Sequence, residues 1–103
     1  MIIRMWKGRV PKEKKAAYVA YLHKTGLADY GKTEGNKGVS LLCRDVGDDV
    51  EFTTMTWWDS IDAIKRFAGE DYTRAKYYPE DANYLREFAP TVEHFDVLYA
   101  SNP

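Results

Sequence analysis

The sequence predicts an α+β fold with a four-stranded antiparallel sheet and helices on one of its faces. Four segments rich in β-branched and aromatic residues have the character of strands. Apolar residues at helical spacing follow the first and the third of these segments. The second and third segments are separated only by the turn "GDD" at 47–49, which makes them a hairpin.

The first half of the chain predicts a strand, a helix and a loop. The strand runs from Ile2 to Val10, and Pro11 suits the first position of a helix, where its missing N–H would have no partner. The helix continues to about Thr25, and Gly26 ends it. Its apolar face consists of Ala17, Tyr18, Tyr21 and Leu22. The glycine-rich stretch "ADYGKTEGNKG", 28–38, predicts a long loop, with its later part over a cavity mouth or a dimer edge.

The second half predicts strands at 39–46 and 50–58, then a helix capped by Asp59 or Ser60 and ended by Gly69. Residues 70–78 predict a further helical turn or two, and a last helix starts at Pro79 and closes before Pro90. The final strand is expected at 91–99. The order β-α-β-β-α-β is that of two split β-α-β units, the ferredoxin-like arrangement, in a single domain over 1–103.

The strands carry apolar residues on both faces. In the third strand Phe52 and Trp58 fall on one side, and Met55 and Trp57 on the other. The last strand likewise carries apolar residues on both of its faces. Because helices cover only one face, a second copy of the chain is expected on the other, as a symmetric homodimer.

Trp57 and Trp58 stand side by side in a predicted strand, so they point to opposite faces of the sheet. One is expected to pack toward the helices of its own chain, and the other to face the partner or the sheet edge. The sequence near the end of a strand does not fix the register, so either assignment of the two indoles is open. Both indoles could also serve packing alone.

Composition excludes several classes of function. Fifteen Lys and Arg against sixteen Asp and Glu give a net charge of −1. The chain therefore lacks the excess of basic residues that is typical of nucleic-acid-binding proteins. No apolar run is long enough for a membrane span or a signal peptide, so a cytoplasmic location is expected. Cys43 is the only cysteine, and His23 and His94 are isolated, so neither a disulfide nor a metal site is expected.

Four stretches carry a family resemblance: "WWDS", "SIDAIKRFAG", "EDYTRAKYYPED" and "VEHFDV". Together they resemble the antibiotic-biosynthesis-monooxygenase domain family over most of the chain. The resemblance implies a dimeric α+β barrel, with a ligand cavity between sheet and helices in each subunit. Members include cofactor-free enzymes that oxidise quinols or anthrones with dioxygen, and haem-degrading enzymes.

The haem-degrading branch fits this sequence poorly. Aligned through "YTRAK", Lys76 stands where that branch has its iron-binding histidine, and Arg66 where it has a tryptophan. A protonated lysine does not ligate iron as imidazole does. The asparagine of that branch is also missing from the first strand, where 5–7 read Met-Trp-Lys.

His94 is the candidate base, because neutral imidazole near pH 7 takes a proton from a phenol or quinol. The alternative is that His94 is a structural residue of the strand, with its hydrogen bonds satisfied and no catalytic role. The expected pocket walls and hydrogen-bond donors are aromatic side chains that could equally belong to the core or a subunit surface: Trp6, Trp58, Tyr72 and Tyr77. No cofactor and no metal is expected.

The leading hypothesis is therefore a cofactor-independent monooxygenase-type protein acting on a quinol, anthrone or polyphenol. A dimeric protein that only binds a small molecule, for sequestration or stress response, is the alternative. An isomerase or decarboxylase on the same scaffold is a third. The sequence does not separate them, because one fold hosts unrelated functions.

Overall fold

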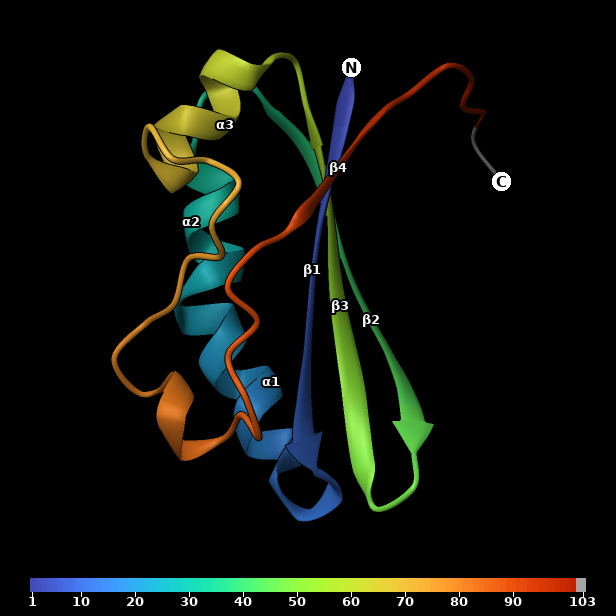
Figure 1. The fold of residues 1–103 in the computed structure, drawn as a ribbon, viewed down its shortest axis with the longest axis vertical. Coiled ribbons are helices and arrows are strands. Elements are labelled where there is room, and N and C mark those ends of the chain that lie inside the picture. The colour runs from blue at the N-terminus through green and yellow to red at the C-terminus, as the bar shows by residue number, and fades with distance from the viewer. Residues whose placement is uncertain (102–103) are drawn as a thin grey trace.

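The computed structural model describes residues 1–101 and contains one four-stranded antiparallel sheet backed by helices (Figure 1). The strands are β1 (Ile2–Pro11), β2 (Asn36–Val46), β3 (Asp49–Trp58) and β4 (Glu93–Asp96). The helices are α1 (Lys15–Lys24), α2 (Gly26–Lys32) and α3 (Ile61–Ala68), with 3-10 turns η1 (Lys12–Lys14) and η2 (Asp81–Asn83). The strand order β2-β3-β1-β4 places the strands that precede helices at the centre. This is the ferredoxin-like order, so the predicted fold class is confirmed.

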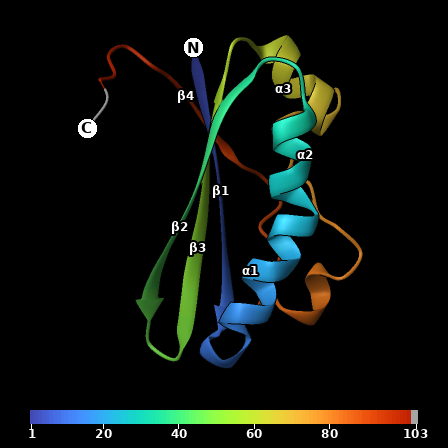
Figure 2. The ribbon, with the colours of Figure 1, turned by 180° about the vertical axis from the view of Figure 1, so that it is seen from behind.

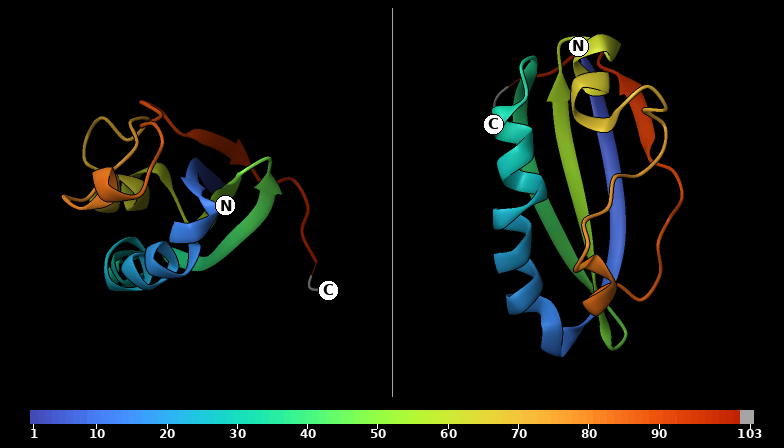
Figure 3. Two further views of the ribbon diagram at one scale, coloured as in Figure 1. Left: turned by 90° about the horizontal axis from the view of Figure 1, so that it is seen from below. Right: turned by 90° about the vertical axis from the view of Figure 1, so that its left-hand side faces the viewer.

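The helices form a single layer. Viewed from behind and from below, α1, α2, α3 and the segment between α3 and β4 lie on the same side of the sheet (Figures 2 and 3). No helix in the described part of the chain covers the opposite face. Within residues 1–101, none of the helices has the length and apolar character needed to cross a membrane.

Burial along β3 alternates with the period of a strand. Phe52 and Trp58 are buried beneath the helices, whereas Met55 and Trp57 lie half-buried on the face without helices. The predicted division of these four residues between the faces is therefore confirmed. Trp58 is the indole that packs toward the helices of its own chain, and its exposed fraction is 0%.

The ends of α3 follow from local sequence. The Ser60 hydroxyl accepts a hydrogen bond from the Ala63 N–H at 3.1 Å, so Ser60 is the N-cap residue. Gly69 follows the helix with φ of 90°, a backbone conformation that favours glycine. Ala63, Ile64 and Phe67 form the buried face between these ends. The predicted helix and its stop are confirmed.

The predicted loop at 28–38 is wrong at both ends, because α2 runs from Gly26, the predicted helix stop, to Lys32, and β2 begins at Asn36. Thr25, with φ of −118° and ψ of −97°, separates α1 from α2. Tyr30 packs face to face with Phe67, with ring centroids 4.4 Å apart, and edge-on to Trp58. Burial of this tyrosine outweighs the low helix propensity of the neighbouring glycines.

The predicted helices between Gly69 and β4 are absent apart from η2. Residues 70–92 instead form an extended irregular segment, which we call the strap. Within it, Arg74 pairs with Thr91 as an isolated β-bridge. The Arg86 N–H also bonds the Arg9 carbonyl of β1 at 2.9 Å. These bonds to distant segments replace the hydrogen bonds that a helix would make along its own axis. The last strand is likewise shorter than predicted, because only residues 93–96 pair with β1.

Gly35 joins α2 to β2 in a conformation that only glycine adopts easily. Its φ is 92°, and a Cβ at this position would lie 2.4 Å from the Cβ of the fully buried Ala63. We expect Gly35→Ala to lower the free energy of unfolding by about 2 to 4 kcal/mol through strain and overpacking together. Chemical denaturation measures the change.

Gly47→Ala is the matched control, because Gly47 has φ of 59° but no atom within 4 Å of an added Cβ. Backbone strain alone should cost about 1 to 2 kcal/mol there. Equal destabilisation by the two substitutions would show that the contact with Ala63 contributes nothing.

Candidate functional site

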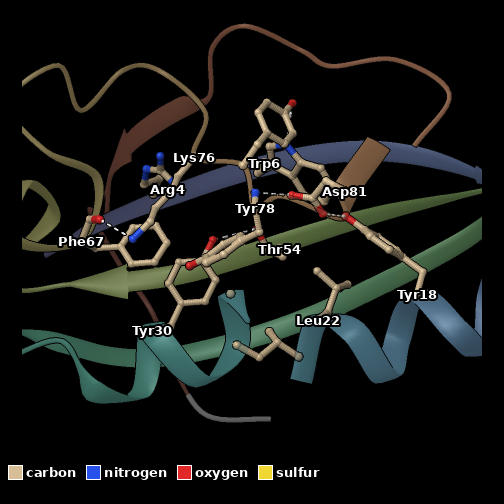
Figure 4. Close-up of a pocket in the computed structure, with 13 residues that line it drawn as sticks. Arg4, Trp6, Tyr18, Leu22, Tyr30, Thr54, Phe67, Lys76, Tyr78 and Asp81 are labelled. Carbon is tan, nitrogen blue, oxygen red and sulfur yellow. Dashed lines mark hydrogen bonds between the residues drawn. The ribbon is translucent and has the colours of Figure 1, made fainter. Parts of the chain in front are cut away.

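A narrow cavity lies between the helix-facing side of the sheet, helices α1 and α2, and the strap 70–92 (Figure 4). Its volume is about 30 Å³, room for one or two water molecules. The walls are mainly aromatic, with two cationic side chains and a carboxylate among them. The lining residues are Arg4, Trp6, Tyr18, Leu22, Gly26, Leu27, Tyr30, Thr54, Phe67, Lys76, Tyr77, Tyr78 and Asp81.

Trp6 and Tyr77, both predicted from the sequence as wall residues, meet in this cavity. The Trp6 Nε1–H donates to the Tyr77 hydroxyl at 3.2 Å, and that hydroxyl donates to the Ala89 carbonyl at 2.7 Å. The indole lies directly over Gly8, where an added Cβ would come within 2.4 Å of it. Strand β1 and the strap are thus joined through one aromatic pair.

Asp81 supplies the carboxylate of the cavity. It is 3% exposed, accepts the Tyr78 N–H at 2.6 Å and accepts the Tyr18 hydroxyl at 3.4 Å. Burial raises the pKa of this carboxyl, and the two hydrogen bonds oppose the rise. A buried carboxylate with a raised pKa is a suitable proton acceptor near neutral pH.

Two cations line the cavity beside Phe67. The Arg4 guanidinium carbon lies 5.5 Å from the centre of the Phe67 ring, and the Lys76 Nζ lies 4.5 Å from it. Arg4 is 2% exposed, and burial lowers the pKa of its guanidinium. Lys76 approaches from the strap and donates to the Phe67 carbonyl at 3.1 Å.

The strap closes the cavity through a few polar contacts with the helices. The Tyr78 hydroxyl donates to Asp29 of α2, and the Glu80 N–H donates to the Tyr21 hydroxyl at 3.0 Å. Lys76 also lies 3.9 Å from the Asp29 carboxylate. The strap therefore covers the cavity, whereas the stretch 33–35, predicted as part of a covering loop, turns against α3 at Ala63.

Trp58 lies in a core cluster with Tyr30, Ile64 and Phe67, and it is not among the cavity-lining residues. Its Nε1–H donates to the Thr56 hydroxyl at 2.8 Å, so its polar atom is satisfied inside the core. Its contact with the cavity is indirect, through the rings of Tyr30 and Phe67.

His94 and Tyr72, the other two predicted site residues, lie together at the β4 edge and outside the cavity lining. Their rings meet edge-on, with centroids 5.2 Å apart. His94 is paired with Arg4 across the β1–β4 ladder, and its Nε2 is buried without a hydrogen-bond partner. Burial first, and then the charge of Arg4, lower the pKa of the imidazole.

This lowered pKa makes a prediction about stability. Because the folded-state pKa lies below the ordinary 6.5, neutral His94 favours the fold above that pH, and the benefit is lost as the pH falls through the folded-state pKa. We expect His94→Gln to lose less thermal stability than the wild type between about pH 7.5 and about pH 5.5. Melting temperatures across this range measure the effect, with His23→Gln on α1 as the control. Parallel curves for His94→Gln and wild type would contradict the prediction.

Most of the cavity lining was not predicted from the sequence, including the polar and aromatic residues Arg4, Tyr30, Phe67 and Asp81. A signal existed for Arg4, because it stands two positions before Trp6 and therefore shares its face of β1. No comparable signal existed for Asp81. Its position depends on the path of a strap that is anchored to distant segments, such as β1 through the Arg86 N–H.

The cavity lining does not suit a porphyrin. Among the lining residues there is no histidine, cysteine or methionine to bind an iron atom, and Lys76 bonds a backbone carbonyl. Burial raises the pKa of each of the four lining tyrosines, which disfavours the phenolate that would bind iron. Within residues 1–101, no group of three or more His, Cys, Asp or Glu side chains is arranged to hold a metal ion.

Known structures share this fold. A Bacillus cereus protein with the provisional name antibiotic biosynthesis monooxygenase matches with a TM-score of 0.65 and 19% identity over 97% of each chain. MhuD, with two manganese protoporphyrin IX molecules bound per active site, matches with a TM-score of 0.63 and 13% identity over 100% of each chain. Rv0793 from Mycobacterium tuberculosis matches with a TM-score of 0.58 and 13% identity, over 99% of this chain and 100% of the other.

No protein-family model and no curated protein sequence matches the chain. At these identities the structural matches establish the fold and nothing finer. The resemblance drawn from the sequence is confirmed at that level: the chain shares the ferredoxin-like fold of these structures.

Proposed function

We propose that this protein is a monooxygenase-type enzyme that oxidises an electron-rich aromatic, such as a quinol, anthrone or related polyphenol, with dioxygen and without a cofactor. The observation that carries the proposal is the enclosed aromatic cavity with one buried carboxylate, Asp81, in its wall. Aromatic walls bind a flat ring through its faces and edges. The fold, shared with the Bacillus cereus protein, supports the proposal.

The proposed reaction begins with removal of one proton from the ligand. For an anthrone, the ring CH₂ group loses a proton to a base, and the delocalised anion gives an electron to dioxygen. The CH₂ carbon finally becomes C=O. One oxygen atom of O₂ enters that carbonyl and the other leaves as water, so the substrate supplies all four electrons. The chain needs to supply only a base and a place for the anion's charge.

Asp81 is the base that the geometry favours, because it lines the cavity and its pKa is raised. His94, the base predicted from the sequence, stays a candidate. The His94 imidazole does not line the cavity. It lies beside Arg4, which does. Substitution of each residue separates the two assignments.

Ligand entry requires movement of the strap, because a volume of about 30 Å³ is smaller than any aromatic ring system. The bonds that join Tyr78 and Lys76 to Asp29 connect half-exposed groups at the rim. The Lys76–Asp29 pair is worth little in water, so the main cost of opening the strap comes from breaking the Trp6–Tyr77 and Glu80–Tyr21 hydrogen bonds.

Oxygen uptake tests the proposed function. Metal-stripped protein is mixed with a panel of quinols and anthrones, and dissolved oxygen and tryptophan fluorescence are followed in the same samples. Uptake above the uncatalysed rate, with one carbonyl oxygen derived from ¹⁸O₂, is the expected result. Turnover without oxygen consumption would replace the proposal by an isomerase or decarboxylase.

A non-catalytic small-molecule-binding protein is the second candidate, and one observation favours it. Asp81 already accepts two hydrogen bonds from the chain, as a purely structural carboxylate would. This candidate predicts saturable quenching of the Trp6 fluorescence with no oxygen uptake and no product.

We also propose that the protein forms a homodimer through the sheet face that carries no helices. Half-buried Ile3, Met5, Met55 and Trp57 lie on this face, and Phe95 is 46% exposed beside them. A continuous apolar patch of this kind marks an interaction surface. Two such sheets pack face to face through their side chains, so the occupant we propose is a second copy.

The dimer makes a prediction of its own. Met55→Arg places a charge at the centre of the open face, twice per symmetric dimer. We expect the dimer dissociation constant to rise by about 100-fold or more, because a charge would be buried without a partner. Sedimentation analysis over a concentration series measures it, with Ala20→Arg on the exposed side of α1 as the control. Equal association of both variants would refute this interface.

A further inference from the structure

The most unusual charge in the molecule is Arg4. The side chain is 2% exposed, and its Nη2 donates to the Arg74 carbonyl at 3.1 Å. The buried Tyr30 hydroxyl beside it raises the pKa of the guanidinium, against the larger, opposite effect of burial. The Arg4 Nε is buried with no acceptor, and no carboxylate of residues 1–101 lies within ion-pair distance of it. A buried guanidinium without a counter-ion lowers stability unless another molecule supplies the anion.

A second cation shares the same end of the cavity. The Lys76 Nζ lies 4.5 Å from the centre of the Phe67 ring and 5.5 Å from that of Tyr78. Its nearest carboxylate, Asp29, is 3.9 Å away at the rim. The Phe67 ring therefore lies between one buried and one partly exposed cation, and its electron-rich face compensates them only in part.

The cavity is polarised along its length. Figure 4 shows Arg4, Lys76 and Phe67 at one end, and Asp81 with Tyr18 at the other. The Asp81 carboxylate is bonded to Tyr78 and Tyr18 and makes no ion pair with either cation. A ligand that spans the cavity would meet a proton acceptor at one end and unpaired positive charge at the other.

We infer that the Arg4–Lys76 end is an anion subsite, which holds the negative oxygen of an aromatic ligand whose charge is delocalised across the ring. The inference rests on the proposed function and narrows its substrate class. In an anthrone, the acidic CH₂ and the carbonyl lie on opposite sides of the central ring. Loss of the CH₂ proton to Asp81 moves the charge to the carbonyl oxygen, where the Arg4 guanidinium compensates it. In a 1,4-quinol the two oxygens are placed in the same way.

Preformed donors at the position where charge develops stabilise that charge without reorganisation. The Arg4 guanidinium meets this condition, because contacts with the Phe67 ring and the Arg74 carbonyl hold it in place before any ligand enters. Arginine also remains protonated in a site where burial would neutralise a lysine.

Binding of 4-nitrophenol tests the subsite without any turnover. Its phenolate delocalises charge across the ring to the nitro group, and its visible absorbance reports the ionised fraction. We expect the wild-type protein to bind the phenolate more tightly than the phenol, so that the pKa of the bound ligand falls. Arg4→Met should weaken phenolate binding by about 10- to 100-fold, and Lys76→Met by about two- to fivefold.

Two controls distinguish loss of charge from loss of fold. 4-Nitroanisole has a similar shape but cannot ionise, and its affinity should be the same in wild type and Arg4→Met. Arg44→Met removes a guanidinium from β2, where the side chain is 71% exposed and outside the cavity lining, and should leave phenolate binding unchanged. Arg4→Met should also keep or raise the melting temperature, because methionine fills the space without a buried charge.

The possible outcomes distinguish failure of the anion subsite from failure of the proposed monooxygenase function. Phenolate binding that depends on Arg4, without any oxygen uptake, would support the anion subsite and refute the proposed monooxygenase function. Oxygen uptake that survives in Arg4→Met would retain the function and overturn the subsite. Absence of binding to the wild type, or a raised pKa of the bound 4-nitrophenol, would also overturn it.

Discussion

Replacing Trp58 with alanine should lower the free energy of unfolding by about 3 to 5 kcal/mol, the largest effect on stability that we expect from one side chain. Trp58 has an exposed fraction of 0% and packs against the rings of Tyr30 and Phe67. Alanine would leave a large void between β3, α2 and α3, and the Thr56 hydroxyl would lose its indole donor. Urea denaturation at a protein concentration where the chain is monomeric measures the loss.

Trp57→Ala is the matched control for Trp58→Ala. The same residue type is removed one position earlier, from the half-buried open face. We expect a loss of about 1 kcal/mol or less in the monomer, together with weaker dimerisation. The adjacent tryptophans would then have separate roles, one in the core of a subunit and one between subunits. A larger loss of monomer stability from Trp57→Ala would reverse this assignment.

Asp81→Asn should lower kcat on a quinol or anthrone substrate by about 10²- to 10⁴-fold, with a small change in KM, if Asp81 is the general base. The amide oxygen can still accept from the Tyr78 N–H, and the amide NH₂ takes the place of the oxygen that accepts from Tyr18, whose hydroxyl can turn to accept from it. The side chain loses the capacity to take a proton. Stopped-flow oxygen consumption measures kcat, and circular dichroism checks that the variant folds.

Two further variants make the experiment on Asp81 decisive. Asp71→Asn, at an exposed position of the strap, should leave kcat unchanged. His94→Gln should reduce kcat by less than Asp81→Asn, because His94 does not line the cavity. If His94→Gln abolished turnover and Asp81→Asn did not, the base would be His94, as predicted from the sequence.

The four strands and α3 could be predicted because their signals are local. The alternation in β3, the hairpin turn, the Ser60 cap and the Gly69 stop each depend on a few neighbouring residues. Their physical causes act at the same range, through side-chain direction in a strand and hydrogen bonds within one helical turn. The order of these elements then left few topologies open, and the predicted fold class followed.

The strap 70–92 could not be predicted, because its conformation depends on partners far along the chain. Its sequence offers a proline start and two acids, the usual beginning of a helix. In the fold, Asp81 instead accepts from Tyr78 and Tyr18, and the Arg86 N–H bonds β1. These contacts outweigh the modest propensity of the segment for helix.

The sequence by itself determined the sheet, its two apolar faces, the capped helix α3 and two walls of the cavity, Trp6 and Tyr77. Tertiary structure alone decided which residues meet inside that cavity. It brought Arg4, Lys76 and Asp81 into one enclosure, although they come from β1 and two points of the strap. It also placed Trp58 in the core and His94 at the sheet edge. The reason is physical: side-chain direction follows from local backbone geometry, whereas a shared cavity depends on the path of every segment around it.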